Sequence, residues 1–251
     1  VVFVRGPVEP GSPFDLERFV PGSELVLRTG LGSDGEETVL TNELHRGAAD
    51  IRDPSVSPEG DRVVFSMRPS EDGAHRLYEI ELGSGEARQL TDGPDRLPSG
   101  SVPADVMPVY GTDGMIYFAS NRHDLLAERR DALDVDLYRI PRDGGEVERL
   151  TYTPSPEIEP TTFRVGPLHG YLVFSLRRAV DQRDQTVGFS FPFDRHVDYH
   201  IYFGITPEEN LFHQFRELPD GRAIAIAGYR ENAWRGGQLT IIDRNLGPDL
   251  P

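Results

Sequence analysis

The chain of 251 residues carries 42 acidic residues against 26 basic ones, and its formal net charge is −16. A surface this acidic repels the phosphates of nucleic acids and of anionic membranes, so neither is expected as a partner, and no apolar run approaches the roughly 20 residues that a membrane-spanning helix needs. The sequence has no cysteine, which excludes disulfides, thiolate metal sites, cysteine nucleophiles and covalently attached c-type haem within these residues.

From the N-terminus onward the chain shows short alternating runs separated by turn residues. Runs at residues 1–4, 24–28 and 37–41 precede the clearest unit, residues 50–91. In this unit a Pro-Glu-Gly-Asp turn precedes the alternating side chains of Val63, Phe65 and Met67, and two further short runs follow. Alternation with a period of two, bounded by Gly, Pro, Asp and Ser, is typical of strands and tight turns. The unit therefore predicts four short strands joined by three turns.

The same unit recurs along the chain with spacings of about 54, 52 and 54 residues. Its first strands align at Asp53-Pro54, Met107-Pro108, Glu159-Pro160 and His213-Gln214. The second strands align at residues 62–66, 115–119, 171–175 and 222–226, the third at Leu77-Tyr78, Leu137-Tyr138 and Ile201-Tyr202, and the fourth at Leu40-Thr41, Leu90-Thr91 and Leu150-Thr151. Four strands per unit of about 50 residues is the pattern of propeller blades, which bury their apolar faces against one another around an axis.

The predicted fold is therefore all-β, a β-propeller of four-stranded antiparallel blades with about five blades represented and the terminal ones partial. We expect one propeller domain over residues 1–251, with blades near residues 1–42, 43–91, 105–151, 157–206 and 210–251. Five blades, of which the first and last are partial, are fewer than the six to eight expected of a closed ring, so the sequence predicts either an excerpt of a longer chain or end strands that pair into a small ring. Residues 121–135, a possible short helix, and residues 177–197 are interpreted as insertions in the repeat.

At this point the motifs support a family resemblance. The run D-P-S-V-S-P-E-G-D-R-V-V-F-S, followed by L-Y-E-I and R-Q-L-T, resembles the TolB-like, PD40-type (WD40-like) propeller repeat, and so do residues 134–151. The D-I-R-D-P run and the later F-H-Q-F-R-E-L-P-D-G-R run resemble the propellers of hydrazine synthase alpha-subunit-like proteins. The resemblance implies a bacterial protein in the periplasm or outside the cell, among relatives that often carry c-type haem. This chain has no C-x-x-C-H motif, so the haem chemistry does not transfer to it.

One stretch has the spacing of a metal site. His196, Asp198 and His200 would share one face of a strand, and two imidazoles with a carboxylate could converge there on a zinc-like ion. Asp198 and His200 also align with Asp134 and Asp136, in the ordinary third-strand position, and this favours a plain polar strand face.

The repeat predicts a second site at the mouth of the central channel, because the first strand of each blade lines it. Asp53, Glu159 and His213 should project there from equivalent positions, with Arg52, Asp105 and Glu157 on the adjoining connections. Such a ring could hold a small polar ligand or a cation such as calcium. The alternative is that these side chains bond to the backbone of the neighbouring blade.

No residues are predicted to be catalytic, because neither G-x-S-x-G nor H-E-x-x-H occurs. The main hypothesis is a non-catalytic binding or scaffold module that takes a protein partner or a small polar ligand through its loop-rich face and channel mouth, with no cofactor of its own. The alternative is the propeller section of a redox protein resembling hydrazine synthase, whose haem sites lie outside these residues. A weaker third hypothesis is the gating propeller of a serine peptidase.

Overall fold

Each repeat forms an antiparallel sheet whose strands follow one another in chain order in the computed structural model. The second blade comprises β4 (Asp50–Val56), β5 (Arg62–Arg68), β6 (Arg76–Glu81) and β7 (Ala87–Gln89), and the third comprises β8 (Asp105–Tyr110), β9 (Met115–Ser120), β10 (Asp136–Pro141) and β11 (Glu148–Arg149). The structure describes residues 1–7, 15–30, 32, 34–45, 47–128, 133–180, 183–204, 211–228, 237–243 and 245. The predicted all-β propeller fold is confirmed.

The other three blades differ in completeness. The first has β1 (Val2–Arg5), β2 (Glu24–Arg28) and β3 (Glu37–Val39), followed by the short helix α1 (Asn42–His45). The fourth has β12 (Glu157–Phe163), the 3-10 turn η1 (Gly166–Leu168), β13 (Tyr171–Val180), β14 (Arg183–Pro192) and β15 (His200–Phe203), and the fifth has β16 (Leu211–Glu217), β17 (Ala223–Gly228) and β18 (Gln238–Ile242). A single parallel pair, Thr186 with Leu211, joins the last two blades into one sheet.

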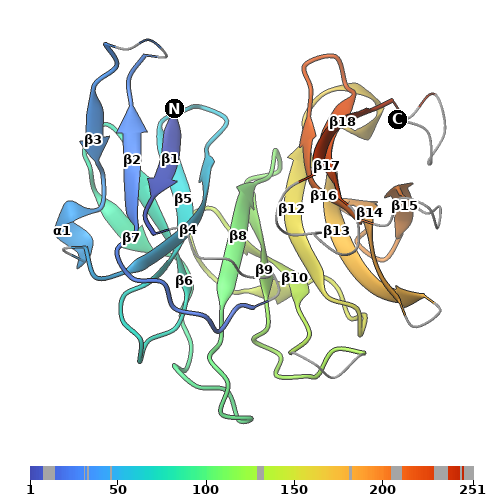
Figure 1. Ribbon diagram of the computed structural model, residues 1–251, viewed down its shortest axis with the longest axis horizontal. Helices are drawn as coiled ribbons and strands as arrows, with labels where there is room; N and C mark the ends of the chain where they lie inside the picture. Colours follow the sequence, from blue (N-terminus) through green and yellow to red (C-terminus); the bar gives the residue numbers. More distant parts are fainter. Residues whose placement is uncertain are drawn as a thin grey trace.

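The blades follow one another across the molecule from the blue N-terminal sheet to the red C-terminal one (Figure 1). No helix in the described part of the chain is long and apolar enough to cross a membrane.

Because successive side chains of a strand point to opposite faces of the sheet, each strand contributes to the interfaces with both neighbouring blades. In β5, Val63 and Phe65 pack with Leu25 and Ile51 between the first two blades, whereas Val64 packs with Phe118 between the second and third. All of these side chains are buried. A blade inside the row is thus apolar on both faces, because a neighbour covers each face.

A buried threonine repeats at the end of the fourth strand and marks equivalent positions. Its hydroxyl accepts the backbone N–H of the third-strand leucine in three blades: Leu25 N to Thr41 Oγ1 at 3.2 Å, Leu77 N to Thr91 Oγ1 at 3.0 Å, and Leu137 N to Thr151 Oγ1 at 2.8 Å. The first of these bonds shows that β2 is a third strand, so the first blade has no first strand among the described residues.

The fourth blade differs from its prediction. The third strand is β14, which pairs with β13 over ten residues from Tyr171–Pro192 to Val180–Arg183. Residues 177–197 are therefore largely a long hairpin, and Ile201-Tyr202 belong to β15, the fourth strand. The run T-V-G-F-S-F at residues 186–191 has the alternation and aromatic content of a strand. This run lacks the Leu-Tyr pair of the third strands β6 and β10, whereas β15 has the similar pair Ile201-Tyr202, so the pair predicts the wrong strand here.

Candidate ligand site in the channel

The first strands of four blades share a backbone irregularity at the channel. The strand register shifts after Arg52, Val106, Ile158 and His213. The next residue in each strand is left-handed, with φ of 53° at Asp53, 55° at Met107, 55° at Glu159 and 54° at Gln214. Few non-glycine residues adopt this conformation, and a β-bulge of this kind turns the side chain away from the regular strand direction.

Hydrogen bonds between blades hold these four residues in a row. Asp53 Oδ2 accepts the N–H of Met107 at 3.1 Å, Met107 Sδ accepts the N–H of Glu159 at 3.2 Å, and Glu159 Oε2 accepts the N–H of Gln214 at 2.8 Å. The side chain of each of the first three bulge residues therefore accepts a hydrogen bond from the backbone N–H of the bulge residue in the next blade. This row, from Asp53 to Gln214, is called the bulge relay below, and it matches the alternative interpretation of these side chains as inter-blade contacts.

The prediction that His213 is equivalent to Asp53 and Glu159 is wrong by one residue. The bulge falls at Gln214, and His213 lies in the preceding position with its Nδ1 3.4 Å from Glu159 Oε1. In the other three blades a proline follows the left-handed residue, and in the fifth blade Phe215 stands there instead. Without this proline, the sequence of the fifth blade carries no local signal for the position of the bulge.

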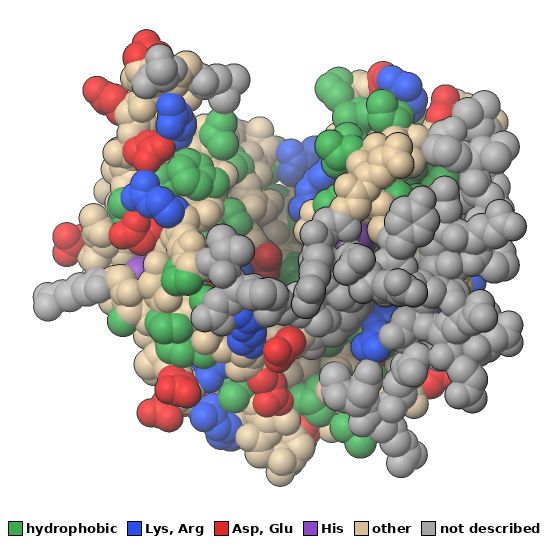
Figure 2. All heavy atoms as spheres, viewed as in Figure 1, with side chains coloured by type: hydrophobic (Ala, Val, Ile, Leu, Met, Phe, Trp, Pro, Cys, Tyr) green, Lys and Arg blue, Asp and Glu red, His purple; other side chains and the backbone are tan. Residues whose placement is uncertain are grey.

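A cavity of about 670 Å³ lies against the bulge relay. It is lined by Leu16, Arg52, Asp53, Pro54, Ser55, Val56, Val106, Met107, Pro108, Val109, Glu159, Pro160, Thr161, Thr162, Arg164, Gln214, Arg216 and Glu217. All four first strands contribute, so the cavity exists only because the blades are assembled. The space-filling view shows the molecule hollowed between its first and last blades, with basic side chains beside the hollow (Figure 2).

The carboxylates of the cavity are largely engaged by the protein itself. Glu159 Oε2 also accepts the Ser175 hydroxyl at 3.1 Å. Glu217 accepts the backbone N–H groups of Arg164 at 2.6 Å and Val165 at 3.0 Å. Desolvation raises the pKa of Asp53, and the charge of Arg52 opposes this shift. Asp53 thus provides the carboxylate with the fewest protein contacts.

The arginines of the cavity are not equivalent. The guanidinium of Arg52 is held by Asp50, at 3.0 Å from Nε to Oδ1 and 2.6 Å from one terminal nitrogen to Oδ2. Arg216 donates from its side chain to the carbonyl of Phe215 at 2.7 Å. Within the part of the chain that the structure describes, neither Arg164 nor Arg216 forms an ion pair with a carboxylate. Both arginines line the cavity, where the charge of Arg216 also opposes the rise in the pKa of Asp53, and the sequence patterns did not single them out.

Asp105 and Glu157 were predicted at the channel mouth and do not line the cavity. Asp105 is fully buried at the start of β8, where its carboxylate accepts the Ser120 hydroxyl at 2.8 Å and pairs with Arg122 at 2.6 Å. Glu157 is fully buried at the start of β12, in contact with the hydroxyls of Thr153 at 3.1 Å and Tyr199 at 3.3 Å. Burial raises the pKa of Glu157 to about 8. Both lie between blades because they precede the bulge that turns side chains toward the cavity.

The predicted metal spacing at residues 196–200 does not form on one strand. His196 lies in a turn, Asp198 follows it, and only His200 belongs to β15. Asp198 is 3.7 Å from Arg195, and His200 is exposed. Because β14 takes the place of the third strand, these three residues have no common strand face.

Comparison with known proteins supports the fold. No family model matches the chain, and no curated protein matches it. Among solved structures, hydrazine synthase from Kuenenia stuttgartiensis superposes with a TM-score of 0.77 at 18% identity, covering 97% of this chain and 37% of that one. TolB from Acinetobacter baumannii gives a TM-score of 0.52 at 16% identity, covering 86% of this chain and 50% of that one.

An oligogalacturonate lyase from Vibrio parahaemolyticus gives a TM-score of 0.54 at 11% identity, covering 87% of this chain and 59% of that one. This chain thus spans between about a third and three fifths of the length of these three structures. Together with the blade topology, these matches show that the chain has a β-propeller fold, which it shares with TolB and with part of hydrazine synthase.

Proposed function

We propose that this chain is a binding module whose channel cavity takes a small polar ligand with an anionic group such as a carboxylate. The observation that carries the proposal is the pair Arg164 and Arg216, which line the cavity and form no ion pair with a carboxylate among the described residues. Guanidinium groups bind carboxylates in a planar, two-pronged geometry. The chain has a net charge of −16, whereas the three arginines of the cavity lining balance its three carboxylates, so the cavity lacks the excess of negative charge found on the chain as a whole.

The cavity also suits this ligand class in size and lining. Its volume of about 670 Å³ falls within the roughly 300–1,000 Å³ of small-molecule sites. Met107, Val106 and Val109 offer an apolar wall, and Gln214 and Asp53 offer hydrogen-bonding groups at the bulge relay. A carboxylic acid with a short apolar portion and a hydrogen-bond donor would use all three kinds of surface. An acidic side chain of a protein partner presents the same chemistry.

The predicted channel cation, such as calcium, stays a prediction. Calcium takes six to eight oxygen ligands, and the oxygens of Glu159 and Glu217 are engaged by the protein. Binding of a cation in the cavity would therefore depend mainly on the carboxylate oxygens of Asp53. A periplasmic or extracellular location also stays a prediction and rests on the resemblance to TolB-like proteins.

The test is calorimetric titration of the chain with a panel of mono-, di- and tricarboxylic acids. We expect at least one acid to bind, and expect R164Q and R216Q each to weaken that binding at least about tenfold. The matched control is R222Q, because Arg222 lies in the same blade as Arg216 but pairs with Asp220 at 2.7 Å away from the cavity. The proposal is overturned if no acid binds, or if the affinity is the same in R164Q, R216Q and R222Q.

A second candidate function is the propeller section of a redox protein resembling hydrazine synthase. The match over 97% of this chain to 37% of the hydrazine synthase chain favours it. The gene sequence on either side of residues 1–251 tests it. A C-x-x-C-H motif there supports this function, and a gene without one counts against it.

A further inference from the structure

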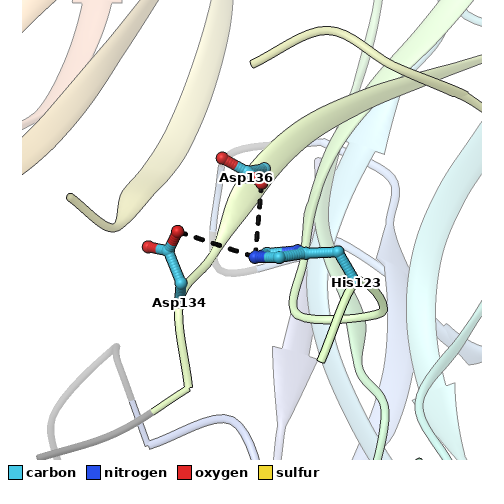
Figure 3. A group of neighbouring side chains, drawn as sticks. All are labelled: His123, Asp134 and Asp136. Atoms are coloured by element: carbon cyan, nitrogen blue, oxygen red, sulfur yellow. Dashed lines mark ion pairs between the residues drawn. The ribbon is translucent and has the colours of Figure 1, made fainter. Parts of the chain in front are cut away.

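A buried cluster of one histidine and two aspartates lies in the third blade, away from the channel cavity. His123 comes from the loop that follows β9, Asp134 from the segment before β10, and Asp136 from the first position of β10. The imidazole points between the two carboxylates (Figure 3). His123 Nε2 lies 3.3 Å from Asp136 Oδ2 and 3.6 Å from Asp134 Oδ2. The three side chains are exposed by only 6%, 3% and 0%.

Several polar atoms of this cluster have no hydrogen-bond partner although they are buried. They are His123 Nε2, Asp134 Oδ1 and, in the adjoining β12, Glu157 Oε2. Buried polar atoms are almost always hydrogen-bonded, so these three atoms at one blade interface are available as ligands for an ion. The other ring nitrogen, His123 Nδ1, lies 3.2 Å from the Tyr138 hydroxyl. This contact orients the ring so that Nε2 faces the aspartates.

The spacing of the three ligand atoms fits a small divalent ion. All three lie within 4.8 Å of one another. For zinc bound at about 2.0–2.1 Å in a tetrahedron, neighbouring ligands are about 3.3–3.4 Å apart, close to the two distances from Nε2. Imidazole with carboxylates suits zinc or manganese, whereas calcium asks for six or more oxygens. The donor set therefore favours a transition metal over calcium.

We propose that His123 Nε2 and the carboxylates of Asp134 and Asp136 bind one divalent transition-metal ion, with zinc as the preferred ion. The ion would tie the loop after β9 to the start of β10. Asp136 also pairs with Arg149 and accepts the Thr151 hydroxyl at 3.3 Å, and these contacts fix its orientation. Arg149 offsets one of the two aspartate charges.

The competing arrangement is a protonated His123 that forms salt bridges with both aspartates and needs no metal. The experiment must therefore measure the metal itself. The full chain is stripped with EDTA and titrated calorimetrically with Zn²⁺, then with Mn²⁺ and Ca²⁺. We expect one Zn²⁺ per chain, weaker Mn²⁺ binding, no Ca²⁺ binding at this site, and a higher melting temperature in Zn²⁺.

Substitutions in the cluster of His123, Asp134 and Asp136 test whether the bound ion lies there. H123Q and D134N should lower Zn²⁺ affinity at least about a hundredfold, and Y138F about tenfold through loss of ring orientation. H75Q is the matched control, because His75 is also a buried histidine, 3.7 Å from Asp50, in a different blade. A double H196Q/H200Q variant controls for adventitious binding at the histidines of the 196–200 segment. Both controls should keep the wild-type affinity.

Two results overturn the proposal. One is the absence of stoichiometric Zn²⁺ binding by the stripped wild-type chain. The other is Zn²⁺ affinity that survives H123Q and D134N or is lost in H196Q/H200Q. If H123Q fails to fold, two other measurements test the proposal: the Zn²⁺ affinity of D134N and the visible absorption spectrum of the wild type loaded with Co²⁺. Co²⁺ in a tetrahedral nitrogen–oxygen site absorbs strongly, whereas free Co²⁺ does not.

Discussion

The backbone N–H of Gln214 donates a 2.8 Å hydrogen bond to Glu159 Oε2 across the interface between the fifth and fourth blades. The same oxygen accepts the Ser175 hydroxyl, and Oε1 faces His213 Nδ1 at 3.4 Å. One buried carboxylate therefore joins both strands of one blade hairpin to the first strand of the next. It is a structural element of the propeller as much as a wall of the cavity.

Removing that carboxylate should loosen the last two blades. E159A leaves the Gln214 N–H and the Ser175 hydroxyl without their acceptor, and we expect the free energy of unfolding to fall by about 2–4 kcal/mol. E159Q keeps one oxygen acceptor and should lose less. Urea denaturation measures both, with E146A as the control because Glu146 is exposed. Equal stability of E159A and E146A would contradict the structural role of Glu159.

The buried threonine that ends the fourth strand in three of the blades gives a second prediction. T91V keeps the shape of the side chain but removes the hydroxyl that accepts the Leu77 N–H at 3.0 Å. Since Thr91 is buried, the N–H cannot turn to water, and the cost should be about 1–3 kcal/mol. T38V, on an exposed position of β3, should change stability by less than about 0.5 kcal/mol. A T91V protein as stable as T38V would show that this bond is dispensable.

The buried side chain of His75 leads us to expect that the free energy of unfolding falls in mild acid. Burial lowers its pKa to about 4, and Arg52 opposes its protonation while Asp50 favours it. The unfolded chain, with a histidine pKa of about 6.5, takes up the proton first as the pH falls. The contribution of His75 to the free energy of unfolding is therefore unchanged above about pH 6.5. It declines by about 3 kcal/mol as the pH falls from about 6.5 to about 4.

Denaturation midpoints measured from pH 7 to pH 4 check this expectation. H75Q lacks the titrating group, so its stability should fall less steeply over that interval, whatever its stability at pH 7. H169Q is the control, because His169 is exposed and should leave the slope unchanged. Parallel curves for the wild type and H75Q would show that His75 titrates alike in both states.

The close approach of β14 and β16 depends on a glycine. A Cβ on Gly188 would lie 2.6 Å from Cζ of Phe215, a fully buried ring of the fifth blade. We expect G188A to destabilise the protein by about 1–3 kcal/mol through overpacking. In the double variant G188A/F215L the smaller side chain relieves the clash, so the two costs should not add. A double-mutant cycle by urea denaturation tests this, and strict additivity would contradict it.

Much of the architecture could be predicted because its causes are local. The alternation of Val63, Phe65 and Met67 and the turn at residues 58–61 lie within a few residues of each other, and they are repeated in the next blades. The prediction became wrong where a local marker was missing. Residues 186–191 form a third strand without a Leu-Tyr pair, and Gln214 forms a bulge without a following proline.

The candidate sites depend on groups that are far apart in the chain. The sequence by itself determined the four-stranded blade, its period and the all-β fold, because strand alternation and turn chemistry act over a few residues. Only the tertiary structure decided which polar groups meet. The bulge relay joins residues 52 to 55 positions apart, and a one-residue bulge decides whether a side chain enters the cavity. The arrangement of Arg164 with Arg216, and of His123 with Asp134 and Asp136, follows from blade packing and loop closure, which leave no regular spacing in the sequence.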